Sequence, residues 1–314
     1  MTIDIEKERI LITGKGGMLG GALDKELRRR GCNEIVAPSR TEVDLTSAHR
    51  VEALFLDLRP TVVFHCASKV FGLKGNIDSP EEVFYTNTLI DTCVLRAAGM
   101  VRPNKIIVAS TVAAYPYPFP RSPLKEADLW YGEPHSGEYG YAQVKRHFLA
   151  GLNVLKRAQG VDYAGCLLTN LYGPGDNFNI ETGHVIPSLI MKALIAKAAG
   201  SDLRVWGDGS QVRDFIHVED AARAMVDVAI GYSGLINIAT GRGTSMMEVV
   251  ECIVRAVSGN VKVVWDPSMP VGIRTRTVDV EKLTELGFKC RIELKEGIRE
   301  VVEWVRQNAD MVRK

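Results

Sequence analysis

Short apolar runs rich in β-branched residues alternate with segments of helical periodicity through the first half of the chain. The runs that predict strands are 9–13, 34–37, 61–66 and 104–109, and the segments that predict helices are 18–30, 47–58 and 80–98. Such alternation predicts a parallel sheet with helices on both faces and right-handed crossovers. Ligands of such sheets bind at the carboxyl ends of the strands. The residues that follow the strands are therefore the candidates for a functional site.

The second half of the chain resumes this pattern after an interruption. A proline-rich stretch at 115–123 breaks the periodicity and predicts a loop over a cleft. Helices are expected at 138–159, 184–199, 218–230, 245–257 and 295–308, and strands at 162–168 and 235–238. The elements together predict an α/β fold, a Rossmann-type doubly wound parallel sheet with a smaller C-terminal lobe that closes over its ligand edge.

The composition excludes several classes of protein. Of the 314 residues, 46% are hydrophobic, enough for a substantial core. The 39 Lys and Arg against 38 Asp and Glu leave a net charge of +1, so no overall field attracts nucleic acid or an anionic membrane. The longest uncharged stretch, 106–120, contains three prolines and is shorter than the ~20 apolar residues that cross a bilayer.

Cysteine usage and the N-terminal stretch predict a cytoplasmic location. The six cysteines form no C-x-x-C pair and no Cys/His cluster with zinc spacing, so we expect reduced thiols and no metal site. The first ten residues carry acids where a secretory signal needs basic and then apolar residues.

A glycine-rich turn follows the first predicted strand and opens a helix. Gly14, Gly17 and Gly20 are spaced three apart, and Met18 and Leu19 begin the helix. Glycines in this place permit a tight turn, let the backbone approach a diphosphate and allow close packing of helix on strand, while helix N-terminal amides face the anion. The context of strand, turn and helix predicts a dinucleotide site that includes Gly14, Gly17, Met18 and Leu19.

The end of the second predicted strand decides between the two nicotinamide cofactors. An acid there would bind the ribose 2′-hydroxyl of NAD, but the chain reads Pro38-Ser39-Arg40. Arg40 could hold a 2′-phosphate, which favours NADP and leaves NAD as the alternative; a solvated loop arginine is the plainer interpretation. Asp44 could bracket the adenine or cap the next helix.

A second group of residues has the chemistry of carbonyl reduction. Tyr141 and Lys145 lie four apart on a predicted helix, so the ammonium group would lie beside the phenol and favour its ionised form. Ser110 and Thr111 end the fourth predicted strand and would place a hydroxyl at the same sheet edge to polarise the reacting oxygen. Tyr-x3-Lys also arises by chance as an exposed pair, and the hydroxyls make the catalytic interpretation stronger.

The chain resembles the extended short-chain dehydrogenase/reductases that act on nucleotide sugars, and within them the GDP-L-fucose synthases. The segments that carry the resemblance, beside the glycine turn and the Tyr141/Lys145 pair, are 67–72 (ASKVFG), 110–115 (STVAAY), 169–174 (TNLYGP), 176–179 (DNFN), 183–187 (GHVIP), 205–207 (VWG) and 213–218 (RDFIHV). The resemblance covers nearly the whole chain. It implies an NADP-binding Rossmann domain at 1–168 and a nucleotide-sugar lobe at 169–314, with 210–240 returning to the sheet.

The resemblance also implies roles for single residues. Thr111, Tyr141 and Lys145 match the catalytic triad of the family, Ser110 could exchange roles with Thr111, and Ala67 would join the cofactor site. The residues that would line the nucleotide-sugar pocket are Asn170, Asn177, Val185, Lys192, Trp206, Arg213 and Arg276. Arg213 is the expected diphosphate contact, because its planar fork suits two phosphate oxygens.

The sequence departs from the fucose synthases at two places. Those enzymes use a cysteine just after the catalytic hydroxyl, with a histidine, to move protons beside the keto group. His184 is present as the matching histidine, but Val112 or Ala113 replaces the cysteine, and neither can accept a proton. Val271 replaces an aspartate of the fucose synthases, which weakens the assignment of guanine.

These observations predict an enzyme that uses NADPH to reduce the C4 ketone of a nucleotide-linked, preferably GDP-linked, 4-keto-6-deoxy sugar, with the missing cysteine arguing against epimerisation at C3 and C5. One alternative is an NAD-dependent nucleotide-sugar 4-epimerase or 4-dehydrogenase with tightly bound cofactor. Another is a nucleotide sensor without catalysis. The resemblance further implies a homodimer formed through the helices at 80–98 and 138–159.

Overall fold

The computed structural model describes residues 3–70, 79–257, 261–269, 272–310 and 312. Phe71, Gly72 and Val271, which the resemblance and its departures involve, lie outside the described residues. Among the described residues, no helix is long and apolar enough to cross a membrane.

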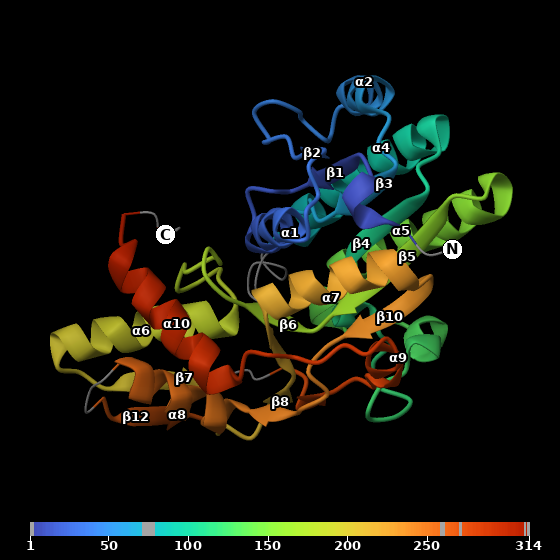
Figure 1. The fold of residues 1–314 in the computed structure, drawn as a ribbon. Coiled ribbons are helices and arrows are strands. Elements are labelled where there is room, and N and C mark those ends of the chain that lie inside the picture. Colours follow the sequence, from blue (N-terminus) through green and yellow to red (C-terminus); the bar gives the residue numbers. More distant parts are fainter. Residues whose placement is uncertain (1–2, 71–78, 258–260, 270–271, 311, 313–314) are drawn as a thin grey trace.

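The centre of the molecule is a sheet of six parallel strands, in the order β10-β5-β4-β3-β1-β2 (Figure 1). Its strands are β1 (Ile10–Thr13), β2 (Ile35–Val36), β3 (Val62–His65), β4 (Lys105–Thr111), β5 (Asp162–Leu168) and β10 (Gly234–Ile238). The chain runs outward from β1 to β2 and then crosses back to β3, so the strand order reverses between β1 and β3. Such a reversal opens a crevice at the carboxyl ends of the two strands.

Two helical layers cover the sheet, as the alternation predicts. The helices are α1 (Met18–Arg29), α2 (Ala48–Leu58), α4 (Pro80–Val101), α5 (Tyr139–Gln159) and α7 (Val218–Gly231). Buried residues of α1 and α7 pack with Ile10 and Ile12 on one face, and those of α2, α4 and α5 pack with Leu11 on the other. Successive residues of β1 therefore pack on opposite faces of the sheet, as the two-residue period of a strand requires.

The C-terminal lobe has a core of its own. Its helices are α6 (Val185–Ala199), α8 (Met246–Val257) and α10 (Leu294–Gln307), which lie together in Figure 1 and enclose a third apolar cluster. Helix α9 (Glu281–Glu285) packs instead beside β10, and its Leu283 belongs to the core of the sheet. The strands of the lobe are β6 (Asn170–Tyr172), β7 (Leu203–Trp206), β8 (Val212–Arg213), β9 (Phe215–His217), β11 (Thr244–Ser245), β12 (Val263–Asp266) and β13 (Thr275–Arg276). The sequence analysis did not predict these strands, because two to four residues are too few to show an alternating pattern.

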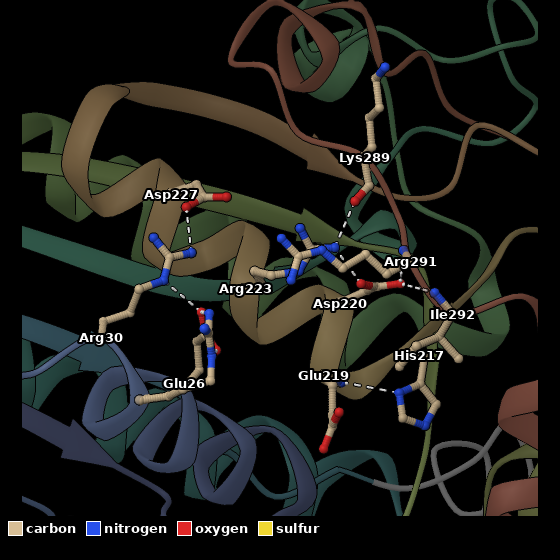
Figure 2. Close-up of polar contacts among 11 residues, drawn as sticks. Glu26, Arg30, His217, Glu219, Asp220, Arg223, Asp227, Lys289, Arg291 and Ile292 are labelled. Atoms are coloured by element: carbon tan, nitrogen blue, oxygen red, sulfur yellow. Dashed lines mark hydrogen bonds and ion pairs between the residues drawn. The ribbon is translucent and has the colours of Figure 1, made fainter.

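Helix α7 joins the two parts of the molecule (Figure 2). Arg30, which follows α1, binds Asp227 of α7 at 2.7 Å. At the other end of α7, Asp220 accepts hydrogen bonds from the N–H groups of Arg291 (2.8 Å) and Ile292 (2.9 Å), just before α10. The carboxylates of α7 thus tie the first helix of the sheet to the last helix of the lobe.

Candidate active site

The glycine turn at the end of β1 packs closely against neighbouring backbone because it lacks side chains. Gly14 has φ +79°, and a Cβ there would lie 2.7 Å from the backbone nitrogen of Ala67. A Cβ on Gly20 would overlap the carbonyl oxygen of Gly14. Helix α1 begins at Met18, so its first N–H groups open onto the crevice between β1 and β3. These features fit the diphosphate of a dinucleotide, and they bring the predicted residues Gly14 and Ala67 together.

Arg40 and Asp44 lie beyond the end of β2. The backbone N–H and hydroxyl of Thr46 donate to the Asp44 carboxylate at 3.0 and 2.7 Å and lower its pKa. The nearby charge of Arg40 lowers that pKa further. Asp44 thus closes a local turn before α2, and the exposed guanidinium of Arg40 stands beside it.

Tyr141 and Lys145 lie one turn apart on α5, as their spacing predicts. The Nζ atom of Lys145 is 5.8 Å from the centroid of the Tyr141 ring, and Lys145 is 1% exposed. Burial raises the pKa of the Cys66 thiol to about 12, and the charge of Lys145 acts against that rise. Lys145 therefore lies near the end of β3, at the crevice.

Burial and nearby acids act against Lys145 in setting the pKa of Tyr141. The charge of Lys145 lowers the pKa of Tyr141, as expected, but burial and the carboxylates of Asp91 and Glu138 outweigh it, so the pKa is raised. A tyrosine of ordinary pKa, about 10, is already protonated at neutral pH, and the upward shift acts in the same direction. A protonated phenol can donate a proton, which is the chemistry of carbonyl reduction.

The hydroxyl pair at the end of β4 faces the start of the next loop. Thr111 is the last residue of β4, and its Oγ1 accepts the N–H of Ala113 at 3.1 Å. The Oγ of Ser110 is buried and has no hydrogen-bond partner among the described residues. The Nε of Arg146 on α5 donates to the carbonyl oxygen of Ala114 at 2.7 Å, so the helix of Tyr141 is fixed to the loop of Thr111.

The predicted substrate residues fall into several groups. Lys192 of α6 and Trp206 of β7 lie together, with the ammonium 5.7 Å from the ring centroid and the ring 47% exposed. Val185 is the exposed first residue of α6. The side chains of Asn170 and Asn177 form hydrogen bonds with backbone groups. Asn170 donates to the carbonyl oxygen of Asp214, and Asn177 accepts from the N–H of Asn179.

The two predicted arginines already have partners inside the protein. Arg213 donates through its terminal nitrogens to the carbonyl oxygens of Val212, Ile273 and Arg274. Arg276 donates through both terminal nitrogens to the carboxylate of Glu138. Burial and the charge of Arg276 lower the pKa of Arg213 to about 10. The planar fork of Arg213 would therefore have to exchange partners before it binds a diphosphate.

His184 lies beside a buried acid. Its Nδ1 is 3.2 Å from Oδ1 of Asp176, and this contact raises the pKa of His184 although burial opposes it. Oδ2 of Asp176 is buried and has no hydrogen-bond partner among the described residues. The position where fucose synthases carry cysteine is Val112 or Ala113, which are 4% and 6% exposed and apolar.

A cavity of about 480 Å³ lies between the starts of α4 and α5. Its lining includes Phe84 and Tyr85 of α4, and Glu138, Tyr139 and Tyr141 at the start of α5. Glu138 therefore reaches the cavity and Arg276 at once, and it stands within one helical turn of Tyr141.

The sequence did not predict four polar residues near this site. Two are Glu138 and Asp176, and the others are Asp91 of α4 and His65, whose Nε2 lies 3.0 Å from Oδ1 of Asp91. A signal for one of them was present. Asn87 and Asp91 lie four apart on the buried face of α4, where an amphipathic helix carries apolar residues. Polar residues on such a face need buried partners, which a search for polar spacing could have indicated. In the described part of the chain, no group of three or more His, Cys, Asp or Glu could hold a metal ion.

Comparison with known proteins places this site in a family. The profile of the NAD dependent epimerase/dehydratase family matches residues 10–235. The chain belongs to this family. It is an NAD(P)-dependent oxidoreductase, and the glycine turn and the Tyr141/Lys145 pair both fall within the matched residues.

Individual relatives are similar over almost their whole length. The GDP-L-fucose synthase of Escherichia coli (strain K12) is 32% identical over 326 residues, covering 98% of this chain and 100% of that protein. The NADP-bound GDP-L-fucose synthetase structure of Naegleria fowleri has a TM-score of 0.91 and 26% identity, covering 100% of this chain and 98% of that one. MlghC, a GDP-mannoheptose C4 reductase from Campylobacter jejuni with NADP bound, has a TM-score of 0.85 and 28% identity, covering 95% and 98%.

Proposed function

We propose that this protein reduces the C4 ketone of a GDP-linked 4-keto-6-deoxy sugar with NADPH. The observation that carries the proposal is the phenol of Tyr141 beside the ammonium of Lys145, at the sheet edge that also holds the glycine turn. The similarity to GDP-L-fucose synthases and to a GDP-mannoheptose C4 reductase supports the GDP-linked ketone as substrate.

Each residue of the site has a separate role in the reduction. When bound, a reduced nicotinamide supplies the hydride that a ketone carbon needs. Tyr141 donates its phenolic proton to the ketone oxygen, and the Thr111 hydroxyl donates a hydrogen bond to the same oxygen. The ammonium of Lys145 stabilises the phenolate that remains until it takes a proton from water. The ketone thus becomes an alcohol with one hydride and one proton added.

Gly14, Gly17, Met18, Leu19 and Ala67 would hold the cofactor diphosphate and nicotinamide side through backbone groups. Arg40 would bind the 2′-phosphate of NADP, with Asp44 beside the adenine. The NADP in the two related structures supports this choice over NAD.

The substrate would bind in the lobe of residues 169–314, while residues 1–168 hold the cofactor. The exposed ring of Trp206 with Lys192 offers a stacking surface for the base, and Val185 lies at the start of the same helix. Arg213 and Arg276 would bind the diphosphate, and Asn170 and Asn177 would shape the loops around it.

Reduction would proceed without epimerisation at C3 and C5. Moving a proton on each of those carbons takes two acid/base groups, and only His184 is present, because Val112 and Ala113 cannot titrate. Product formed in heavy water should therefore not carry deuterium at both C3 and C5. Deuterium at both carbons would show that epimerisation persists.

The direct experiment mixes the purified protein with NADPH and a GDP-linked 4-keto-6-deoxyhexose and follows NADPH absorbance. We expect NADPH consumption with the GDP sugar, and slower consumption with the UDP or dTDP analogue or with NADH. A protein that retains NAD through purification and inverts C4 with no net NADPH consumption would be a 4-epimerase instead. Binding of GDP sugars without any turnover would indicate a sensor.

We also propose that the protein is a cytoplasmic homodimer. Phe84, Tyr85 and Leu89 of α4 and Val154 of α5 are exposed apolar residues on the two helices that the resemblance assigns to the dimer. Sedimentation of the purified protein at several concentrations tests this: a monomer at all of them contradicts it.

A further inference from the structure

Two arginines of the C-terminal lobe lie on neighbouring strands. Arg276 of β13 is the register partner of Arg213 of β8, and the two strands are parallel. Register partners on adjacent strands lie about 5 Å apart, and their side chains leave the same face of the sheet. Burial and the positive charge of Arg276 both lower the pKa of Arg213, because the two charges repel each other. An anion between them would stabilise such a pair.

Glu138 supplies an anion from the other part of the molecule. Its carboxylate accepts from both terminal nitrogens of Arg276, from Nη1 at 3.2 Å and also from Nη2. The charge of Glu138 also raises the pKa of Arg213, against the effects of burial and of Arg276. Arginine binds phosphate oxygens through the same planar arrangement of two N–H groups. Glu138 therefore gives Arg276 what an anionic ligand would give it.

One donor of Arg276 has no acceptor in this arrangement. Arg276 is 9% exposed, and its Nε is buried without a hydrogen-bond partner among the described residues. A guanidinium has five N–H groups, and the two oxygens of the Glu138 carboxylate accept from its terminal nitrogens only. A buried donor without an acceptor is unfavourable. A phosphate group carries more oxygens than a carboxylate and would satisfy more of the donors of Arg276.

Arg276 is held in place independently of Glu138. The guanidinium carbon of Arg276 is 5.9 Å from the ring centroid of Phe119, and Phe119 packs edge-on against Tyr117 with 5.2 Å between centroids. Glu138, by contrast, lies at the junction between a short 3-10 helix, Ser136–Glu138, and the start of α5, and its side chain is 21% exposed. In an exchange of partners, Glu138 is therefore the group that moves.

The place of Glu138 indicates which phosphate it opposes. Glu138 lies three residues before Tyr141, and both residues line the cavity between the starts of α4 and α5. Under the proposed function, the sugar ketone lies at Tyr141 and the base lies at Trp206. The Glu138 end of Arg276 is then on the sugar side of the diphosphate.

We propose that Glu138 is a built-in competitor of the substrate diphosphate: its carboxylate occupies Arg276 in the free protein, and the sugar-side phosphate displaces it on binding. This inference rests on the proposed function and adds a residue that the substrate must displace. A ligand without a phosphate on the sugar side leaves the ion pair intact. The wild-type protein therefore binds the diphosphate less tightly than its two arginines would allow.

The first arm of the test is a calorimetric titration with GDP and with GMP, at saturating NADP so that the cofactor site is filled. Glu138→Gln should raise the affinity for GDP by roughly two- to ten-fold. The affinity for GMP, which lacks the sugar-side phosphate, should change by less than about two-fold. Glu133→Gln, at an exposed acid of the preceding loop, should change neither. Unchanged GDP affinity in folded Glu138→Gln would overturn the proposal.

The second arm repeats the GDP titration in an Arg276→Gln background. A competitor acts only through the arginine that it occupies, so Glu138→Gln should have no effect on GDP affinity there. Equal tightening in both backgrounds would overturn the proposal, because it would show a general effect of the negative charge.

A second variant keeps the test decisive if Glu138→Gln does not fold, which melting curves check. Glu138→Asp keeps the charge but is one methylene shorter, so it cannot reach both terminal nitrogens of Arg276 in the same way. Its GDP affinity should lie between those of the wild type and Glu138→Gln. Wild-type GDP affinity in folded Glu138→Asp, where Glu138→Gln is unfolded, would contradict the competition.

These titrations also separate this inference from the proposed function. A wild-type protein that binds GDP but reduces no ketone would contradict the reductase function, and the GDP titrations would still decide the role of Glu138. If neither protein binds GDP, the GDP-linked substrate is contradicted, and pyrophosphate replaces GDP as the probe. Equal pyrophosphate affinity in the wild type and Glu138→Gln would then overturn the competition.

Discussion

The sheet edge and the C-terminal lobe hold their functional groups in opposite ways. At the edge, Gly14, Thr111 and Lys145 are placed by strand ends and one helix. In the lobe, Arg213 and Arg276 are already bonded to main-chain carbonyls and to Glu138. The cofactor and catalytic groups are thus placed by regular secondary structure, whereas the two arginines of the substrate region must exchange partners to bind a ligand.

The largest effect should come from the proton donor at the sheet edge. Tyr141→Phe removes the phenolic proton and should lower kcat by about 10²- to 10⁴-fold, with NADPH affinity retained. The rate of NADPH consumption at saturating substrate measures kcat, and a binding titration measures the affinity for NADPH. Tyr131→Phe, at an exposed tyrosine before α5, is the control; equal losses in both variants would remove Tyr141 from the mechanism.

The glycine turn should tolerate a methyl group at one position and not at another. Gly14→Ala forces an alanine to φ +79° with its Cβ 2.7 Å from Ala67, which should cost about 1–3 kcal/mol of unfolding free energy and weaken NADPH binding. Gly16→Ala is the matched control, because nothing lies within 4 Å of its Cβ. Urea unfolding and cofactor titration of both variants test this. Similar results for the two alanines would show that the backbone at Gly14 moves to admit a methyl group.

The lobe should bind the nucleotide sugar more tightly when Arg276 is released from Glu138. Glu138→Gln removes the carboxylate that occupies both terminal nitrogens of Arg276, so a diphosphate would meet less competition. We expect the KM for the nucleotide sugar to fall by roughly two- to ten-fold. Glu133→Gln, at an exposed acid of the preceding loop, should leave KM unchanged. A higher KM in Glu138→Gln would mean that Glu138 holds Arg276 ready for substrate instead.

The smallest effect is the pH dependence of His184. Its pKa is raised by Asp176, so the pair stabilises the fold below the ordinary histidine pKa of about 6.5, and this stability is lost as pH rises through the raised value. The wild type should therefore lose more Tm than His184→Gln as pH increases across this range. Parallel melting curves for the two proteins would show that Asp176 does not hold the imidazolium.

How much of the site the sequence predicts depends on the distance along the chain between partners. The glycine turn and the Tyr141/Lys145 pair involve neighbours within about two helical turns, and local periodicity predicts their proximity. Two of the three carbonyl partners of Arg213 are at 273 and 274, and the partner of Arg276 is Glu138. No local pattern indicates such distant pairs, so the sequence predicts a ligand for the fork of Arg213 and does not indicate the carbonyls that it binds in the structure.

By itself, the sequence determined the alternation that makes a parallel sheet, the turn that only glycine can form, and the tyrosine and lysine on one helix face. These depend on backbone sterics and helical periodicity, which act between residues close in the chain. Only the tertiary structure decided that burial outweighs Lys145 in its effect on the pKa of Tyr141, and that Arg276 is bonded to Glu138. Those properties depend on burial and on the field of distant side chains, which exist only after the chain has folded.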